Sequence, residues 1–102
     1  MFNKIKMRAR LIQIGIELTE LSSKLESVPI FWNFQYMKFP ESTRKEIMGW
    51  MERTYELGIE EANIFLKLRE YDLYKQVLEQ LKISEKNIAE VKYMCIQEGV
   101  GY

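Results

Sequence analysis

The apolar residues in the first quarter of the chain are spaced so that only a long helix can place them on one side. They are separated by alternating steps of four and three residues, the spacing of a coiled-coil seam. The series is Met7, Leu11, Ile14, Leu18, Leu21, Leu25 and Val28. Polar residues such as Arg10 and Glu17 fall on the other side, as in an amphipathic helix. The spacing predicts a helix over residues 4–27, which ends where Pro29 disfavours helical geometry at Val28.

Two interpretations of this seam are open. Other helices of the same molecule fold back on it, or it also pairs with a second copy or with a partner helix. Three heptads are short for a free-standing coiled coil, which favours the first interpretation. The residues of a self-association seam would be Met7, Leu11, Ile14, Leu18, Leu21 and Leu25. The apolar face is wider in the first half of the helix, through Ile5, Ala9, Ile12 and Ile16.

An aromatic connector follows between Pro29 and Pro40, where five of ten residues are aromatic. We expect an extended or short helical segment whose rings plug the helical core. The alternatives are a partner-docking segment and a base-stacking platform, which is less favoured because only Lys38 adds positive charge. The partner-binding candidates are Phe31, Trp32, Phe34, Tyr36 and Phe39.

Capping signals divide the second half of the chain. Residues 43–46 fit a capping box that would begin a helix at Thr43, and Gly58 is suited to end it. Gly49, inside this helix, is expected to let another helix approach. Helical spacing resumes over residues 59–81.

Two more helix boundaries are expected in the last third of the chain. Residues 69–72 would break the helical stretch, with Asp72 as the N-cap of the next helix. The last helix would begin at Ser84 and end at Gly99, a glycine placed as a C-cap.

These elements predict an all-α fold, a compact bundle of four to five helices with a long N-terminal helix and a Pro-bounded aromatic connector. The 102 residues suffice for a single domain, 1–102, and 47% of them are hydrophobic, enough for a core. Thirteen per cent aromatic residues and six Met exceed what one small core needs. Part of this apolar surface is therefore expected to be covered by another molecule.

The apolar spacing over residues 73–98 resembles a helix-turn-helix motif, with residues 82–84 as the turn. In that motif the second helix enters the major groove of DNA. The sequence departs from the pattern at Leu78 and Lys82, where a small residue and a glycine are usual. The outer face of the second helix is also not basic, which disfavours phosphate binding. An ordinary helical hairpin is the favoured alternative.

A second candidate for binding is the basic start of the chain, which has no acidic residue before Glu17. Its cations oppose the helix dipole, which suggests a use such as docking to phosphates or to an acidic protein; a solvated polar face is the simpler interpretation. The candidate nucleic-acid contacts are Lys4, Lys6, Arg8, Arg10, Lys86, Asn87, Lys92 and Tyr93.

Nothing in the sequence indicates an enzyme. There is no His, which excludes His-based triads and most zinc and iron sites. Cys95 follows Val91 by one helical turn and is expected in the core. The carboxylates that come nearest to forming acidic clusters are expected on solvated faces: Glu56, Glu60, Glu61, Glu70 and Asp72. We therefore expect no catalytic residue, no metal, no cofactor and no small-molecule substrate.

The formal net charge is zero, which gives no general attraction to nucleic acid or to an anionic membrane. No apolar run has the length of a membrane span, and no signal peptide is recognisable. The expected location is the cytoplasm of the producing or host cell. We expect a small interaction protein (a regulator, inhibitor, adaptor or assembly factor) that binds a protein partner, with a second copy of itself as one candidate. The alternative is a DNA-binding regulator that uses residues 73–98.

Overall fold

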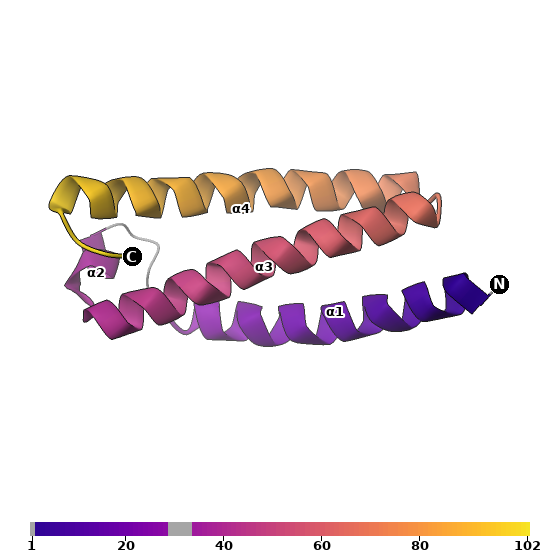
Figure 1. Ribbon diagram of the computed structural model, residues 1–102, viewed down its shortest axis with the longest axis horizontal. Coiled ribbons are helices and arrows are strands. Elements are labelled where there is room, and N and C mark those ends of the chain that lie inside the picture. The colour runs from indigo at the N-terminus through magenta and orange to yellow at the C-terminus, as the bar shows by residue number, and fades with distance from the viewer. Residues whose placement is uncertain (1, 29–33) are drawn as a thin grey trace.

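The computed structural model describes residues 2–28 and 34–102, apart from the side chains of Phe2, Phe34 and Gln35. Every regular element in this part of the chain is helical, so the prediction of an all-α fold is confirmed (Figure 1). The described helices are α1 (Phe2–Glu26), α2 (Phe34–Lys38), α3 (Glu41–Lys67) and α4 (Tyr71–Glu98).

The three long helices lie side by side, with α3 in the middle (Figure 1). Helices α1 and α4 run in one direction and α3 runs in the other. Both outer helices pack mainly on α3 and hardly on each other. The molecule is elongated, with extents of 51 × 20 × 18 Å. Its radius of gyration is 15.7 Å, whereas a compact domain of this size would have about 13 Å.

The predicted N-terminal helix is confirmed by α1, but the boundaries expected for the next helix are wrong. Helix α3 begins at Glu41 after Pro40 and has no side-chain cap, so Thr43 caps nothing. The helix also continues through Gly58 to Lys67. Packing of α3 against two neighbours along its length outweighs the low helix propensity of a single glycine, which is about 1 kcal/mol.

Gly58 has a different role from the one its sequence context suggests. It is buried, and a Cβ at this position would lie 2.6 Å from Leu81 Cδ2 on α4. The missing side chain therefore lets α3 and α4 approach closely. We expected this role for Gly49, but a Cβ there would meet nothing within 4 Å.

The break predicted within residues 69–72 is confirmed, although Glu70 and not Asp72 is the N-cap. Arg69 turns the chain with φ 60°, a left-handed conformation that is uncommon for a residue with a side chain. Glu70 N–H donates to the Phe65 carbonyl at 2.9 Å, which satisfies one of the last carbonyls of α3.

The turn expected at Lys82–Ser84 does not form. Helix α4 runs unbroken from Tyr71 to Glu98, so both interpretations of this segment, the favoured helical hairpin and the helix-turn-helix, are wrong. Leu81 packs at Gly58, and Ile88 and Val91 pack in a core cluster, so their burial against α3 favours one continuous helix. The predicted end of the helix is confirmed, since Gly99 has φ 70° and its N–H donates to the Ile96 carbonyl at 3.1 Å.

The core has two parts. At one end of the molecule, Tyr36, Ile47, Met51 and Cys95 of α2, α3 and α4 form a buried cluster, and Leu25 of α1 packs against it. We call this the closed end. Tyr36 and Cys95 are fully buried, so the predictions of an aromatic plug and of a core cysteine are confirmed for these two residues.

The second cluster belongs to α1 and α3 only, and contains Ile14, Leu21, Leu57 and Ile64. Trp50 packs against both clusters and so links the two parts of the core. The structure thus changes along its length, from four helices around one core to two outer helices that share only α3.

Candidate partner-binding groove

A groove opens where α1 and α4 are held apart by α3. Its volume is about 780 Å³. Helix α1 provides one wall with Leu18, Ser22, Leu25 and Glu26. Helix α3 provides the floor with Met51, Thr54, Gly58 and Glu61. Helix α4 provides the other wall, between Gln76 and Asn87.

The lining combines apolar side chains with a polar rim. Leu18, Leu25 and Met51 continue the core into the groove, and Ile83 on α4 exposes 55% of its surface. Carboxylates come from all three helices: Glu26, Glu61 and Glu79. No Lys or Arg belongs to the lining among the described residues. The groove therefore offers apolar contacts inside an acidic frame.

Glu61 is the most unusual of these carboxylates. Burial raises the pKa of its carboxyl group, because a poorly hydrated environment disfavours the charged form. It makes no hydrogen bond or ion pair with any residue in the described ranges. Glu61 is thus partly covered, whereas we expected a solvated face; a helical period does not tell which side of α3 the neighbouring helices leave uncovered.

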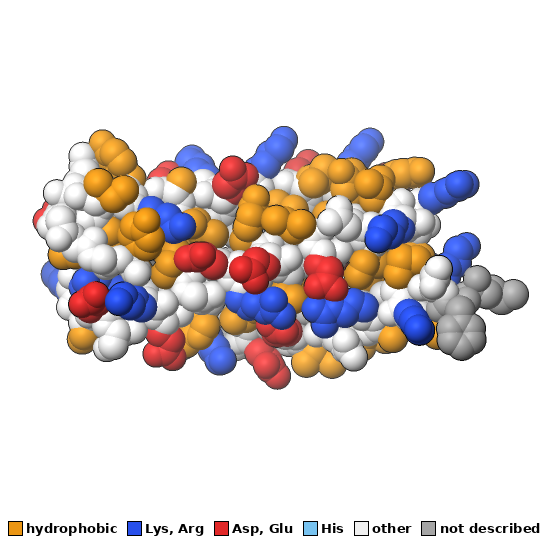
Figure 2. Space-filling model, viewed as in Figure 1, with side chains coloured by type: hydrophobic (Ala, Val, Ile, Leu, Met, Phe, Trp, Pro, Cys, Tyr) orange, Lys and Arg blue, Asp and Glu red, His pale blue; other side chains and the backbone are white. Residues whose placement is uncertain are grey.

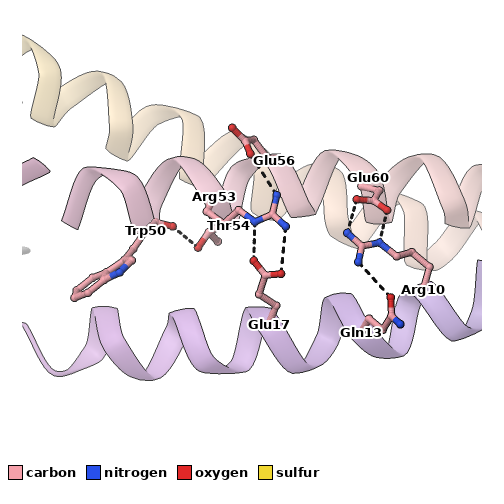
Figure 3. Close-up of polar contacts among 8 residues, drawn as sticks. All are labelled: Arg10, Gln13, Glu17, Trp50, Arg53, Thr54, Glu56 and Glu60. Carbon is pink, nitrogen blue, oxygen red and sulfur yellow. Dashed lines mark hydrogen bonds and ion pairs between the residues drawn. The ribbon is translucent and has the colours of Figure 1, made fainter. Parts of the chain in front are cut away.

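The neighbouring Glu60 points elsewhere, toward α1. Figure 3 shows two charge pairs that join α1 to α3. Arg10 donates from Nε and Nη2 to Glu60 at 2.5 and 2.8 Å. Arg53 donates to Glu17 from Nε at 2.6 Å and from Nη2 at 3.2 Å. These hydrogen bonds lower the pKa of both carboxyl groups. In Figure 2, acidic and basic side chains accordingly alternate along the middle of the visible face.

The basic start of the chain is thus partly neutralised within the molecule. Besides Arg10, Arg8 donates to Glu70 at 2.8 Å, and Lys6 also has an interaction of its own. Two carboxylates that we expected in solvent, Glu60 and Glu70, hold these cations. Their partners lie 50 and 62 residues away in the chain, a separation that local sequence patterns do not reveal.

The aromatic candidates for partner binding that the structure describes lie in the core. Tyr36 is fully buried, and its hydroxyl donates to the Arg44 carbonyl at 2.8 Å. Phe39 packs against the same cluster. Both residues therefore act in the core, as the favoured interpretation of the connector predicts, and not as a partner-docking surface. Phe31, Trp32 and the side chain of Phe34 lie outside the described residues.

The C-terminal candidates for nucleic-acid contact do not share one face. Lys86 and Lys92 are six residues apart on one continuous helix, which separates them by about 120° around its axis. Asn87 lines the groove. The ammonium of Lys92 lies 5.2 Å from the centre of the Tyr102 ring, and the Tyr93 hydroxyl accepts a hydrogen bond from Gln97. Without the predicted turn, these residues are not assembled into a recognition helix.

The heptad seam of α1 packs inside the molecule. Ile14 and Leu21 are buried, and the other seam residues pack against the two core clusters: Met7, Leu11, Leu18 and Leu25. Pairing of this seam with a second copy would require the residues to leave α3. The outward-facing stripe of α1 is different, because Ile5, Ile12 and Ile16 are 58–69% exposed. Their spacing in the sequence predicts a wider apolar face on α1 but does not tell that this side faces solvent.

Among the residues that the structure describes, no three His, Cys, Asp or Glu side chains gather in a way that could hold a metal ion. Within the same residues, no helix is both long enough and apolar enough to cross a membrane. Comparisons of the chain with protein-family models, with curated proteins and with solved structures find no significant match.

Proposed function

We propose that this chain is a non-catalytic interaction protein that binds a helical segment of a partner protein in the groove between α1 and α4. The observation that carries the proposal is the arrangement of the three long helices. Two parallel helices flank an antiparallel one, as in a four-helix bundle from which one helix is missing. An amphipathic helix laid in the groove would complete such a bundle.

The groove lining supports this occupant. A bound helix would cover Leu18, Leu25 and Ile83, and burial of apolar surface contributes about 25 cal/mol per Å². The rim offers Ser22, Asn87 and other polar side chains that can bond to the sides of the helix. An apolar strip bounded by polar residues is the usual form of a helix-in-groove site.

Photo-cross-linking in the producing cell tests the proposal. A benzophenone amino acid would replace Ile83 in the groove wall or, as a control, Glu56, which is exposed on α3 and lies outside the groove lining. We expect a cross-linked polypeptide from position 83 only, attached through a segment with helical apolar spacing. Ser22→Trp should abolish it by filling the groove.

Two outcomes would contradict this function. One is equal cross-linking from positions 83 and 56. The other is attachment through segments of the partner that have no helical periodicity. Either outcome would mean that the groove does not select a helix.

A second candidate function is self-association, which the exposed stripe of α1 favours. Ile5, Ile12 and Ile16 are separated by steps of seven and four residues, so one side of α1 presents a coiled-coil spacing to solvent. Two copies could pair along this side without disturbing the packing of the seam on α3.

Light scattering over a range of concentrations tests self-association. We expect a dimer mass for the native chain and a monomer mass for Ile12→Glu. Gln13→Glu adds the same charge at a neighbouring exposed position of α1 and should leave the dimer intact. A native chain that stays monomeric at the highest concentration would exclude this candidate.

A further inference from the structure

We propose that the helix bound in the groove is cationic, and that one of its Lys or Arg side chains pairs with Glu61. This inference rests on the proposed function and names the chemistry of the partner. Two observations support it, namely the charges of the lining and the position of Glu61. A third argument is the energetic cost of covering that residue.

The charges of the lining have one sign. Glu26, Glu61 and Glu79 come from α1, α3 and α4 respectively, and no cation of the described chain lines the groove with them. The whole sequence nevertheless has equal numbers of acidic and basic residues, 15 of each. Cations are therefore placed elsewhere, and two of them, Arg10 and Arg53, are engaged in the charge pairs between α1 and α3. The acidic groove is a local feature that a basic partner would complement.

Two of the carboxylates lie at the same level of the groove. Gly58 on α3 meets Leu81 on α4, and the two helices are antiparallel. Glu61 is nearly one turn after Gly58, so it is level with the turn before Leu81, which carries Glu79. A helix in the groove would thus meet its strongest negative potential at one level, which favours a Lys or Arg at one position of its apolar face.

The cost of covering the Glu61 carboxylate depends on the charge of the bound helix. This carboxylate is already poorly hydrated and has no counter-charge within the described chain. A neutral helix would remove its remaining water without replacing the lost hydrogen bonds, which is unfavourable for an ionised group. An acidic helix would add repulsion. A Lys or Arg would supply the missing partner, and a single buried polar pair of this kind also fixes the register of a helix.

The test uses two synthetic amphipathic helical peptides with the same leucine stripe, one with Lys and one with Glu at the positions that flank the stripe. Binding would be measured by isothermal titration calorimetry at moderate ionic strength. We expect the Lys peptide to bind at least tenfold more tightly than the Glu peptide. Glu61→Gln should weaken binding of the Lys peptide about tenfold, which corresponds to about 1.4 kcal/mol.

Two variants serve as controls. Glu52→Gln removes the same charge from an exposed position of α3 outside the groove lining, and should leave the affinity unchanged. Ser22→Trp should abolish binding of the Lys peptide by filling the groove. Circular dichroism of each variant would establish that it is folded.

The outcomes separate this inference from the function on which it rests. If both peptides bind with similar affinity, the cationic partner is wrong while helix binding stands. If Glu61→Gln binds the Lys peptide as tightly as the native chain does, the pairing with Glu61 is wrong while helix binding stands. If neither peptide binds, the proposed function fails together with the inference. Binding of the Lys peptide that Ser22→Trp does not reduce would place it outside the groove and overturn both.

Discussion

The closed end and the groove are built from the same three long helices, yet only one of them has a complete core. At the closed end, the short helix α2 contributes Tyr36 to a cluster that also holds Ile47 and Cys95. In the groove section, no described segment of the chain occupies the corresponding position, and α1 and α4 share only α3. The chain thus provides its own fourth helix over one short segment and leaves the remaining length open. Under the proposed function, the open section is where a second molecule would fit.

The largest expected difference between the two regions is their response to loss of an apolar side chain. Ile47 is fully buried at the closed end, whereas Ile83 in the groove wall is 55% exposed. Ile47→Ala should lower the free energy of unfolding by about 2–5 kcal/mol, and Ile83→Ala by less than about 0.5 kcal/mol. Urea denaturation followed by circular dichroism measures both. Similar losses would mean that the groove wall is part of the core.

A smaller effect is expected from the buried arginine of the closed end. Arg44 donates from Nη1 to the Phe39 carbonyl at 2.7 Å and from Nε to the Gly101 carbonyl at 3.1 Å. Arg44→Met keeps the apolar stem but leaves both carbonyls without their donor, which should remove about 1–3 kcal/mol of stability. Denaturation curves of Arg44→Met and of the exposed control Lys45→Met would measure the difference. Equal stability of the two variants would show that water replaces the guanidinium.

Two glycines of α3 test whether the close approach of α3 and α4 beneath the groove requires a residue without a side chain. Gly49→Ala should raise stability by up to about 1 kcal/mol, because the site is exposed and alanine favours a helix. Gly58→Ala forces Leu81 to move and should be less stable than Gly49→Ala by about 1–2 kcal/mol. Thermal melts of both variants give the comparison. Equal gains would show that Leu81 adjusts freely and that close approach does not require Gly58.

The smallest expected effect is the pH dependence of stability. At neutral pH the ionised Glu61 should destabilise the fold, whereas the paired carboxylates Glu17 and Glu60 should stabilise it. The pKa of Glu61 is raised by burial, so the ionised form destabilises the fold above that pKa and the penalty disappears as pH falls through it. Glu61→Gln should therefore be more stable than the native chain at neutral pH and lose this advantage on acidification.

Glu17 and Glu60 have lowered pKa values, so their stabilisation is present at neutral pH and is lost as pH falls through those lowered values. Glu60→Gln should thus be less stable than the native chain at neutral pH. Urea denaturation at neutral and at acidic pH would measure both variants. An advantage of Glu61→Gln that persists at acidic pH would contradict the assignment to Glu61.

Local patterns were enough to predict the helices but not all of their boundaries. The helix that carries the α1 seam was correctly predicted, because its apolar residues pack against the two core clusters. Gly58 and Ser84 were wrongly predicted as a C-cap and an N-cap. Both residues are common at caps, but a neighbouring helix packs alongside each position and keeps the helix intact. Gly99 has the left-handed φ that ends a helix, and there the cap prediction was confirmed.

The groove could not be predicted from the sequence, because it depends on two helices, α1 and α4, that hardly contact each other. Periodicity indicates which residues of α1 and α4 are apolar, but not whether α1 and α4 contact each other across α3. Glu61 carried no local signal that distinguishes it from Glu60, although one points into the groove and the other toward Arg10. The excess of apolar residues over the needs of a small core was the available hint, and the exposure of Ile83 and of the isoleucines on α1 is consistent with it.

The three-residue link between α3 and α4 (68–70) also has a kinetic consequence. A hairpin of two helices with so short a connection forms through local contacts, which favours fast folding. Helix α1 depends on α3 and hardly on α4, so it can join this hairpin later and detach from it without opening it. The chain would then contain two cooperative units of unequal lifetime, and one wall of the groove would belong to the shorter-lived unit.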